Sequence, residues 1–194
     1  MIEALARAAP VEAVRGALVD GPPAWLVGGV VRDALLGRRL ADVDLAVDGD
    51  PRRAAKQVAR ALGGPAFQLS EAFGSWRALS GDRAFSCDVS ALQGESIEAD
   101  LARRDFTINA IAVPLCGGEP VDPHGGWVDI DRRTLRVLGE SAYAEDPLRA
   151  LRLVRLSAEL GFQPDAETER RTAAAAPRLL EPAPERVFAE LRRT

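Results

Sequence analysis

The segment DVDLAV at positions 42–47 constrains this chain more than any other. Its apolar residues predict a buried strand, and residues two apart on a strand point to the same face, so Asp42 and Asp44 present their carboxylates together. Two unpaired carboxylates in such a place cost several kcal/mol each to bury, and they repel each other unless a cation lies between them. Oxygen ligands in this arrangement favour Mg²⁺ or Mn²⁺, although a short D-x-D by itself is more often an exposed strand end paired with arginines.

A glycine turn precedes this strand. The residues AWLVGG predict a short strand that runs into Gly28 and Gly29, and VVRDALLG predicts the following helix. Glycines let the backbone approach a phosphate closely, with N–H groups at the helix start facing it. Arg32 can add a planar donor fork. A tight turn with a surface arginine is the alternative for this segment alone, but the D-x-D that follows it favours a nucleotide phosphate site.

Composition indicates a globular protein. The chain has 194 residues, of which 47% are hydrophobic and 28% charged, and no apolar run approaches the roughly 20 residues that span a bilayer. The net charge of −4 argues against nucleic-acid binding by bulk electrostatics. Residues 1–20 predict an amphipathic helical segment, broken or restarted at Pro10, and not a signal peptide. The distant Cys87 and Cys116 indicate reduced thiols and a cytoplasmic protein.

Two kinds of pattern divide the chain. Strands and helices alternate over about 140 residues, and helical patterns follow from Glu145. Asp50-Pro51 predicts a helix start, Gly81-Asp82 predicts a hairpin turn, and DFTINAIAV is compatible with either strand or helix. The further segments that we expect as strands are AFQLS, WRALS and RAFSCDVSAL, and those that we expect as helices are SIEADLARR, DPLRALRLVRLSAELG, DAETERRTAAAAPRLL and PERVFAELRR.

Arginines gather beside carboxylates at two further places. In RRDFTINA, Arg104 can reach a polyphosphate while Asp105 or Asn109 fixes the local backbone, and a local salt-bridge cluster is the alternative. In EDPLRALRLVR, Asp146-Pro147 predicts an N-cap and first helical residue.

Three arginines follow that helix start, at positions 149, 152 and 155. Their spacing of three makes a slanted ridge, on which Arg149 neighbours Asp146 and Arg155 lies about half a turn around. An acceptor beside a donor fork can hydrogen-bond a base edge. A surface arginine stripe is an equal alternative.

Together these motifs resemble the class II tRNA nucleotidyltransferase and bacterial poly(A) polymerase family, a branch of the polymerase-β-like nucleotidyltransferases. The resemblance extends from about Trp25 to the C-terminus. PERVFAEL is similar to a segment in the family's neck. The four motifs that carry the resemblance, in order, are GGVVRDALLGRRLADVDLAV, DLARRDFTINAIAV, VDPHGG and EDPLRALRLVRLSAELGF.

The resemblance implies a fold and a division of the chain. The fold is an α/β (α+β) nucleotidyltransferase head, with a small mixed sheet flanked by helices, followed by an all-α neck. The head would take in residues 1–139 and the neck residues 140–194. The family's body and tail domains, which grip tRNA, would be absent from a chain that stops at Thr194, so we expect either a fragment or a minimal enzyme that uses an oligomer or an additional RNA-binding subunit.

The resemblance also implies residue roles. Asp42 and Asp44 would hold Mg²⁺ (or Mn²⁺) ions, one activating an RNA 3′-hydroxyl for in-line attack on the α-phosphate and the other steadying the triphosphate and pyrophosphate. Asp88 stands where the superfamily can offer a third carboxylate, a solvent-facing strand residue being the alternative. Asp146 and Arg149 would read the base of CTP or ATP. The full set implied to bind the nucleotide is Gly28, Gly29, Arg32, Arg104, Asp146, Arg149, Arg152 and Arg155.

We therefore expect a metal-dependent enzyme that adds CMP and/or AMP from CTP/ATP to an RNA 3′ end, with tRNA as the expected acceptor and no membrane partner. Only a short segment separates Asp88 from Arg103, without the arginine- and proline-containing signature of family enzymes that build a full CCA end. This short segment resembles that of family members that add only part of the CCA end, or that of members that form a separate lineage. CCA, CC and A addition and poly(A) synthesis stay open, and the alternative is a head–neck module that binds nucleotide or RNA without turnover.

Overall fold

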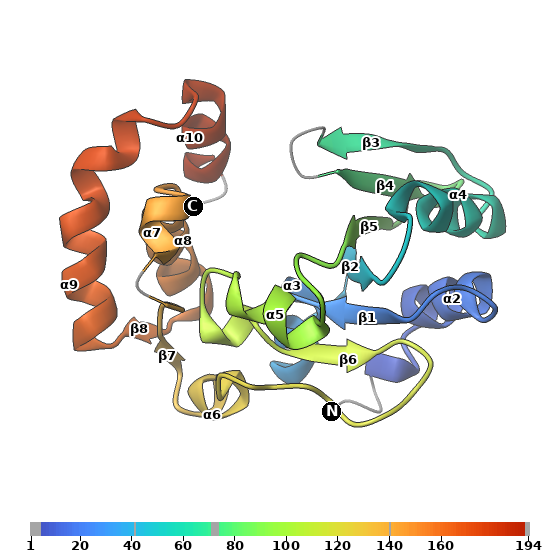
Figure 1. Cartoon of the computed structure of the whole chain (residues 1–194), viewed down its shortest axis with the longest axis horizontal. Coiled ribbons are helices and arrows are strands. Elements are labelled where there is room, and N and C mark those ends of the chain that lie inside the picture. The colour runs from blue at the N-terminus through green and yellow to red at the C-terminus, as the bar shows by residue number, and fades with distance from the viewer. Residues whose placement is uncertain (1–4, 41, 71–73, 140, 193–194) are drawn as a thin grey trace. The chain divides into compact units, whose positions relative to one another are not determined.

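The computed structural model describes residues 5–40, 42–70, 74–139 and 141–192 (Figure 1). The chain separates into two compact units. Unit 1 takes in Met1–Leu101 and Ile111–Asp122, and unit 2 takes in Ala102–Ala110 and Pro123–Thr194. These units are not the same division as the head and neck expected from the sequence, which stays a prediction. Each unit is described by itself.

Unit 1 is built on a mixed six-stranded sheet in the order β3-β4-β5-β2-β1-β6. β2 and β5 run parallel, and all other neighbouring strands are antiparallel. This sheet confirms the expected fold class. The strands are β1 (Ala24–Val27), β2 (Asp42–Val47), β3 (Ala66–Ser70), β4 (Ser75–Leu79), β5 (Ser86–Ala91) and β6 (Ala112–Pro114).

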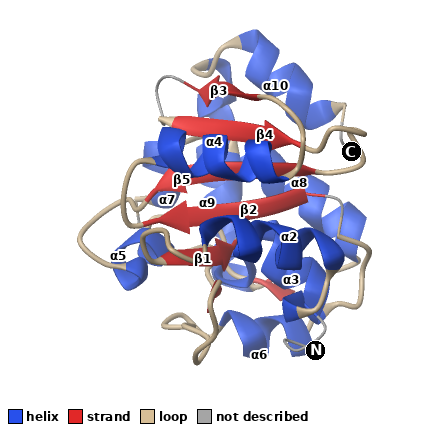
Figure 2. Cartoon of the chain, turned by 90° about the vertical axis from the view of Figure 1, so that its right-hand side faces the viewer, coloured by secondary structure: helices blue, strands red, loops and turns tan. Residues whose placement is uncertain are grey.

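Helices α2 and α4 lie side by side over one face of this sheet (Figure 2). The Arg52 guanidinium of α4 lies over the ring of Trp76, which marks the strand face that α4 covers. Trp76 is opposite Val89, and Val89 is opposite Leu45, so these apolar side chains share that face. The helices of unit 1 are α2 (Ala9–Leu18), α3 (Gly29–Leu35), α4 (Pro51–Ala61) and α5 (Ile97–Ala102).

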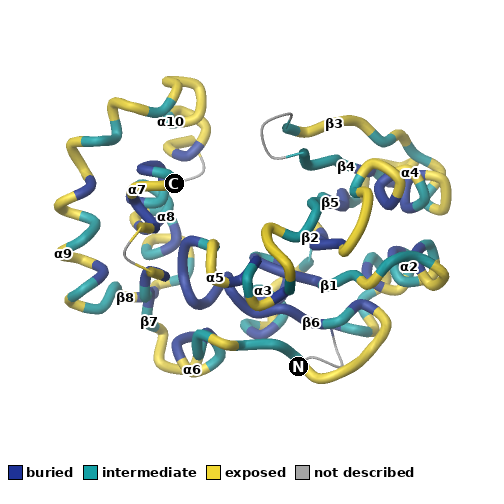
Figure 3. Tube along the Cα trace, viewed as in Figure 1, coloured by how far each residue is buried: buried dark blue, intermediate teal, exposed yellow. Residues whose placement is uncertain are grey.

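Alternation along β2 places its carboxylates on the other face. Most of β2 is buried (Figure 3). Val43, Leu45 and Val47 are buried, while Asp42 is exposed and Asp44 is half-buried. Strand alternation therefore explains why two aspartates occur in an otherwise apolar strand. One face of β2 packs under helices, and the first two residues on its other face are the charged ones.

Unit 2 is mostly helical (Figure 1). Its apolar interior includes Phe106, Ile108, Leu156 and Phe162, each at most 1% exposed. The two-residue strands β7 and β8 pair in parallel and were not predicted. The elements are η1 (Thr107–Asn109), α6 (Gly126–Asp131), β7 (Thr134–Leu135), α7 (Ala142–Glu145), α8 (Arg149–Leu160), β8 (Gln163–Pro164), α9 (Ala166–Ala175), η2 (Ala176–Leu180) and α10 (Pro184–Leu191).

Most predicted elements form where expected. The ambiguous DFTINAIAV segment holds both structures, the 3₁₀ turn η1 followed by strand β6. The helix expected to start at Pro147 starts instead at Arg149, although the Asp146 side chain still accepts the backbone N–H of Leu148 at 3.2 Å. Within the described residues, no helix combines the length and apolarity that a membrane crossing requires.

Candidate functional site

A row of charged side chains crosses three strands on the open face of the unit 1 sheet. Asp44 on β2 is opposite Asp88 on β5, and Asp88 is opposite Arg77 on β4. Directly opposite residues on neighbouring strands point to the same face, so the three side chains stand together. The row places the predicted third carboxylate beside the predicted metal pair.

Arg77 holds Asp88 through both carboxylate oxygens. Nε of Arg77 donates to Oδ1 and Nη2 donates to Oδ2, each at 2.6 Å. These hydrogen bonds are the main reason that the pKa of Arg77 lies above its ordinary value; desolvation opposes them, and the charges of Asp88, Asp42 and Asp44 add to them. The third carboxylate is therefore paired with a cation, and it is not a bare solvent-facing side chain.

The glycine turn lies beside Asp44. β1 is antiparallel to β2 with Leu26 opposite Leu45, so the end of β1 meets the beginning of β2. A methyl group built on Gly29 would lie 3.5 Å from Nη2 of Arg32 and 3.8 Å from Oδ2 of Asp44. Gly29 therefore lies against both a guanidinium and a carboxylate of the predicted site.

Arg32 is held in place from within its own helix. It is 7% exposed, and its Nε donates to Oδ1 of Asp33 at 2.9 Å. Gly28, the residue before α3, has φ 71° and ψ −134°, a conformation that is open essentially to glycine alone. The predicted glycine turn thus needs Gly28 for its backbone conformation. It needs Gly29 because Arg32 and Asp44 lie close to the backbone there.

The donor set of unit 1 fits a small divalent cation. Asp42 and Asp44 offer hard oxygen ligands on one face, and Oδ1 of Asp42 also accepts a hydrogen bond from Oγ of Ser86 at 2.6 Å. Mg²⁺ is commonly held by one or two carboxylates together with substrate phosphates. In the described part of the chain, no group of three or more His, Cys, Asp or Glu side chains could hold a metal ion, which leaves a two-carboxylate set.

The remaining predicted site residues belong to unit 2, where one of them, Arg152, contacts the buried Asp105. Its Oδ1 accepts the backbone N–H of Phe106 at 2.8 Å and Nδ2 of Asn109 at 2.9 Å, and its Oδ2 accepts Nη1 of Arg152 at 3.0 Å. Burial alone would raise the pKa of Asp105, but the charge of Arg152 and these hydrogen bonds together lower it. Asp105 thus bonds to the local backbone at Phe106, and Asn109 bonds to the Asp105 side chain; that Asp105 or Asn109 fixes the local backbone stays a prediction.

The predicted base-reading pair has separate partners. Arg149 donates to the backbone carbonyls of Arg103 at 2.6 Å and Ala142 at 3.2 Å. Oδ2 of Asp146 accepts Nη2 of Arg186 at 3.0 Å. These contacts orient both side chains from their own unit.

Arg152 and Arg155 are not a surface stripe. Besides Asp105, Arg152 contacts Oε1 of Glu190 at 3.4 Å, and Nε of Arg155 donates to Oε2 of the same carboxylate at 2.9 Å. Glu190 is 8% exposed and belongs to α10. The two arginines join α8 to α10, so whether either contacts a nucleotide stays a prediction.

Sequence reasoning missed several residues of these networks, among them Arg77, Ser86, Arg186 and Glu190. Each meets its partner only through strand register or helix packing. Glu190 had an indirect signal, because it lies in the PERVFAEL segment already compared with the family's neck.

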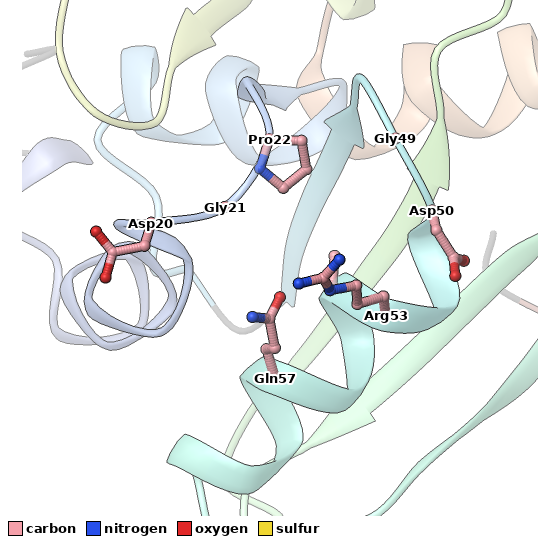
Figure 4. A pocket seen from close by; sticks show the side chains of 8 residues that line it. Asp20, Gly21, Pro22, Gly49, Asp50, Arg53 and Gln57 are labelled. Atoms are coloured by element: carbon pink, nitrogen blue, oxygen red, sulfur yellow. The ribbon is translucent and has the colours of Figure 1, made fainter.

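A shallow depression elsewhere in unit 1 holds none of the predicted site residues (Figure 4). It lies where β2 leads into α4, whereas the predicted carboxylates lie at the start of β2. Its described lining residues are Asp20, Gly21, Pro22, Gly49, Asp50, Arg53, Ala54 and Gln57.

Comparison with known proteins places these motifs in a family. The Poly A polymerase head domain matches residues 24–136, a span that includes β1, the carboxylates and the RRD segment. The chain belongs to this family. The matched span holds the glycine turn, Asp42, Asp44, Asp88 and Arg104, and it ends before the EDPLR segment.

Two curated relatives extend the match beyond the head domain. The chain is 43% identical over 168 residues to a CC-adding tRNA nucleotidyltransferase of Geobacter sulfurreducens, covering 87% of this chain and 39% of that protein. It is 46% identical over 175 residues to an A-adding tRNA nucleotidyltransferase of Deinococcus radiodurans, covering 88% and 39%. The chain thus spans about two fifths of the length of these relatives.

Solved structures agree with this assignment. A tRNA nucleotidyltransferase complexed with a primer tRNA and an incoming ATP analog superposes with a TM-score of 0.78 at 33% identity, covering 93% of this chain and 55% of that one. A tRNA-processing enzyme with CTP has the same TM-score and identity, covering 93% and 50%. These structural matches cover 93% of the chain, so the likeness to solved tRNA-processing enzymes extends into the helical part beyond residue 136, where the head-domain match ends.

Proposed function

We propose that this poly(A) polymerase head-family chain transfers a nucleotide from CTP or ATP to the 3′ end of an RNA without a nucleic-acid template, and that tRNA is the acceptor. The observation that carries the proposal is that Gly29 lies against both Arg32 and Asp44, at the start of the strand β2 that also carries Asp42. Relatives named as CC-adding and A-adding enzymes support the same reaction class.

The reaction makes one bond and breaks one. The RNA 3′-oxygen bonds to the α-phosphorus, the bond from that phosphorus to the bridging oxygen of pyrophosphate breaks, and the hydroxyl proton passes to solvent. Asp42 and Asp44 would hold Mg²⁺ or Mn²⁺, which when bound lowers the pKa of the attacking hydroxyl and offsets phosphate charge.

The protein's own side chains supply position and charge. Arg32 offers donors to phosphate oxygens, and Gly29 keeps the adjoining surface free of a side chain. In unit 2, Arg104 would contact the phosphates or sugar and Asp146 with Arg149 would read the base. We also propose the division into a head at 1–139 and a neck at 140–194.

A single incorporation assay tests this proposal. The protein is incubated with Mg²⁺, each labelled nucleoside triphosphate, and tRNA transcripts that end before the CCA sequence, after its first C or after its second C. We expect incorporation of CMP or AMP on at least one acceptor, and we expect Asp42→Asn and Asp44→Asn to lower it by about a thousandfold or more while the fold stays intact.

The pattern of products then assigns the specificity among CC, A and CCA addition and poly(A) synthesis. Nucleotide binding without incorporation on any acceptor would overturn the enzymatic proposal and favour a binding module. Near-normal rates in either aspartate variant would overturn the metal assignment.

A further inference from the structure

We infer that Arg77 is a positioning residue that keeps Asp88 out of the metal ligand set and thereby sets the divalent-cation affinity of the Asp42–Asp44 pair. This inference rests on the proposed function, because it concerns the same metal site. It concerns a residue that no motif of the sequence marks.

Strand register would let Asp88 serve as a ligand. Asp88 is directly opposite Asp44 on the neighbouring parallel strand, at a spacing of about 4.8 Å, and both side chains stand on the open face. A carboxylate in that position is close enough to share a cation with Asp44.

Its contacts place Asp88 in a different role. Both of its oxygens accept strong, parallel hydrogen bonds from one guanidinium at 2.6 Å, the geometry in which Arg binds carboxylate most firmly. The fork uses one acceptor site on each oxygen and offsets the carboxylate's charge, so Asp88 is a weaker metal ligand than an unpaired carboxylate would be.

Arg77 also acts on the metal pair through its charge. It lies two strands from Asp44, roughly 10 Å away, within the screening length of physiological salt. The positive charge of Arg77 offsets the negative charge of Asp88, so that Asp42 and Asp44 act as a two-carboxylate site. Loss of Arg77 would free Asp88 and add a negative charge next to Asp44.

A double-mutant cycle tests the inference on the nucleotide-free protein. Binding of Mn²⁺ is measured from the electron paramagnetic resonance signal of the free ion, for the wild type, Arg77→Met, Asp88→Asn, the double variant and Arg77→Lys. Asp44→Asn serves as the site control, and urea unfolding reports whether each variant folds.

We expect Arg77→Met to bind Mn²⁺ about fivefold or more tightly and Asp88→Asn to bind it more weakly, because the first leaves a free carboxylate and the second a free guanidinium. The double variant, in which both partners are neutral, should bind within about twofold of the wild type, as should Arg77→Lys, which keeps the charge. The double variant remains decisive if a single variant does not fold, since it leaves no unpaired charge.

Three outcomes overturn the inference. A double variant that binds as weakly as Asp44→Asn would show that Asp88 is itself a ligand. If Arg77→Met binds Mn²⁺ with unchanged affinity while Asp44→Asn still binds it poorly, Arg77 does not set the metal affinity, and the proposed function is unaffected. A wild type that binds no Mn²⁺, or binds it as Asp44→Asn does, would overturn both.

Discussion

Nη1 of Arg152 lies 3.0 Å from Oδ2 of Asp105, although the two residues are 47 positions apart in the chain. The pair joins helix α8 to the RRD segment inside unit 2. Asp105 is 5% exposed, so its charge depends on this partner and on two nitrogen donors close to it in sequence, the backbone N–H of Phe106 and Nδ2 of Asn109.

We expect Arg152→Met to lower the free energy of unfolding by about 3 kcal/mol, because it leaves a buried carboxylate without its cation. Urea unfolding at pH 7 measures this loss. Arg170→Met is the matched control: Arg170 pairs with Glu167 on α9 at a position where its side chain is 70% exposed, and the change should cost less than about 1 kcal/mol. Equal effects in the two variants would contradict a buried role for Arg152.

The same pair predicts an acid-sensitive stability. Burial opposes ionisation of Asp105, but Arg152, Asn109 and the Phe106 backbone lower its pKa in the folded state. A carboxyl whose folded-state pKa is depressed stabilises the protein above its unfolded pKa of about 3.9, and this stabilisation is lost as the pH falls through the folded value.

Unfolding free energies measured from pH 6 down to pH 3 check this prediction. The wild type should lose more stability over that range than Asp105→Asn, which has no proton to take up at this position. Parallel curves for the two proteins would show that Asp105 does not contribute.

Gly28 and Gly29, the two glycines of the glycine turn, should respond differently to replacement by alanine. Gly28→Ala forces a side chain into φ 71°, ψ −134° and should cost about 1–3 kcal/mol of stability. Gly29→Ala meets only ordinary contacts at 3.5 Å and 3.8 Å, so its stability should change by less than about 1 kcal/mol.

For Gly29→Ala we expect a loss of nucleotide affinity instead, about tenfold or more, because the methyl group lies between Arg32 and Asp44 where a phosphate would approach. Thermal unfolding and fluorescent-nucleotide titration measure the two effects separately. Unchanged nucleotide affinity in Gly29→Ala would argue against a phosphate at this turn.

Replacement of Arg149 tests base reading. Its guanidinium donates to two backbone carbonyls, of Arg103 and Ala142, which fix the orientation of this planar group. A lysine ammonium cannot reproduce that geometry. Arg149→Lys should therefore change the ratio of CTP to ATP use by about tenfold while triphosphate affinity changes less. Competition between the two labelled nucleotides measures the ratio, and a uniform loss for both would indicate a phosphate contact.

Local sequence was enough to predict most of the fold. The segment DVDLAV forms a strand at Asp42–Val47, as predicted. Its apolar residues favour a buried strand, and the segments on both sides of it contain helix and turn signals. Asp50 caps α4 through the N–H of Arg52 at 2.9 Å, with Pro51 as the first helical residue. The exact start of α8 was less predictable, since helix ends depend on cap geometry.

Some residues of the candidate site could likewise be predicted from the sequence, and others could not. Asp42, Asp44 and the glycine turn were predictable because their alignment follows from strand periodicity and from residues close in sequence. The partners of Asp88 and Asp105 were not, because each depends on which strand or helix packs opposite.

The sequence by itself determined most of the secondary structure, the family motifs and the residue types that could carry nucleotide chemistry. Only the tertiary structure decided which charges meet. The chain has 25 basic Lys and Arg residues and 29 acidic ones, so composition allows many pairings. Register selects Arg77 for Asp88, and helix packing selects Arg152 for Asp105 and Arg155 for Glu190. Coulombic and hydrogen-bond energies fall steeply with distance and angle, and those distances are set by contacts between segments far apart in the chain.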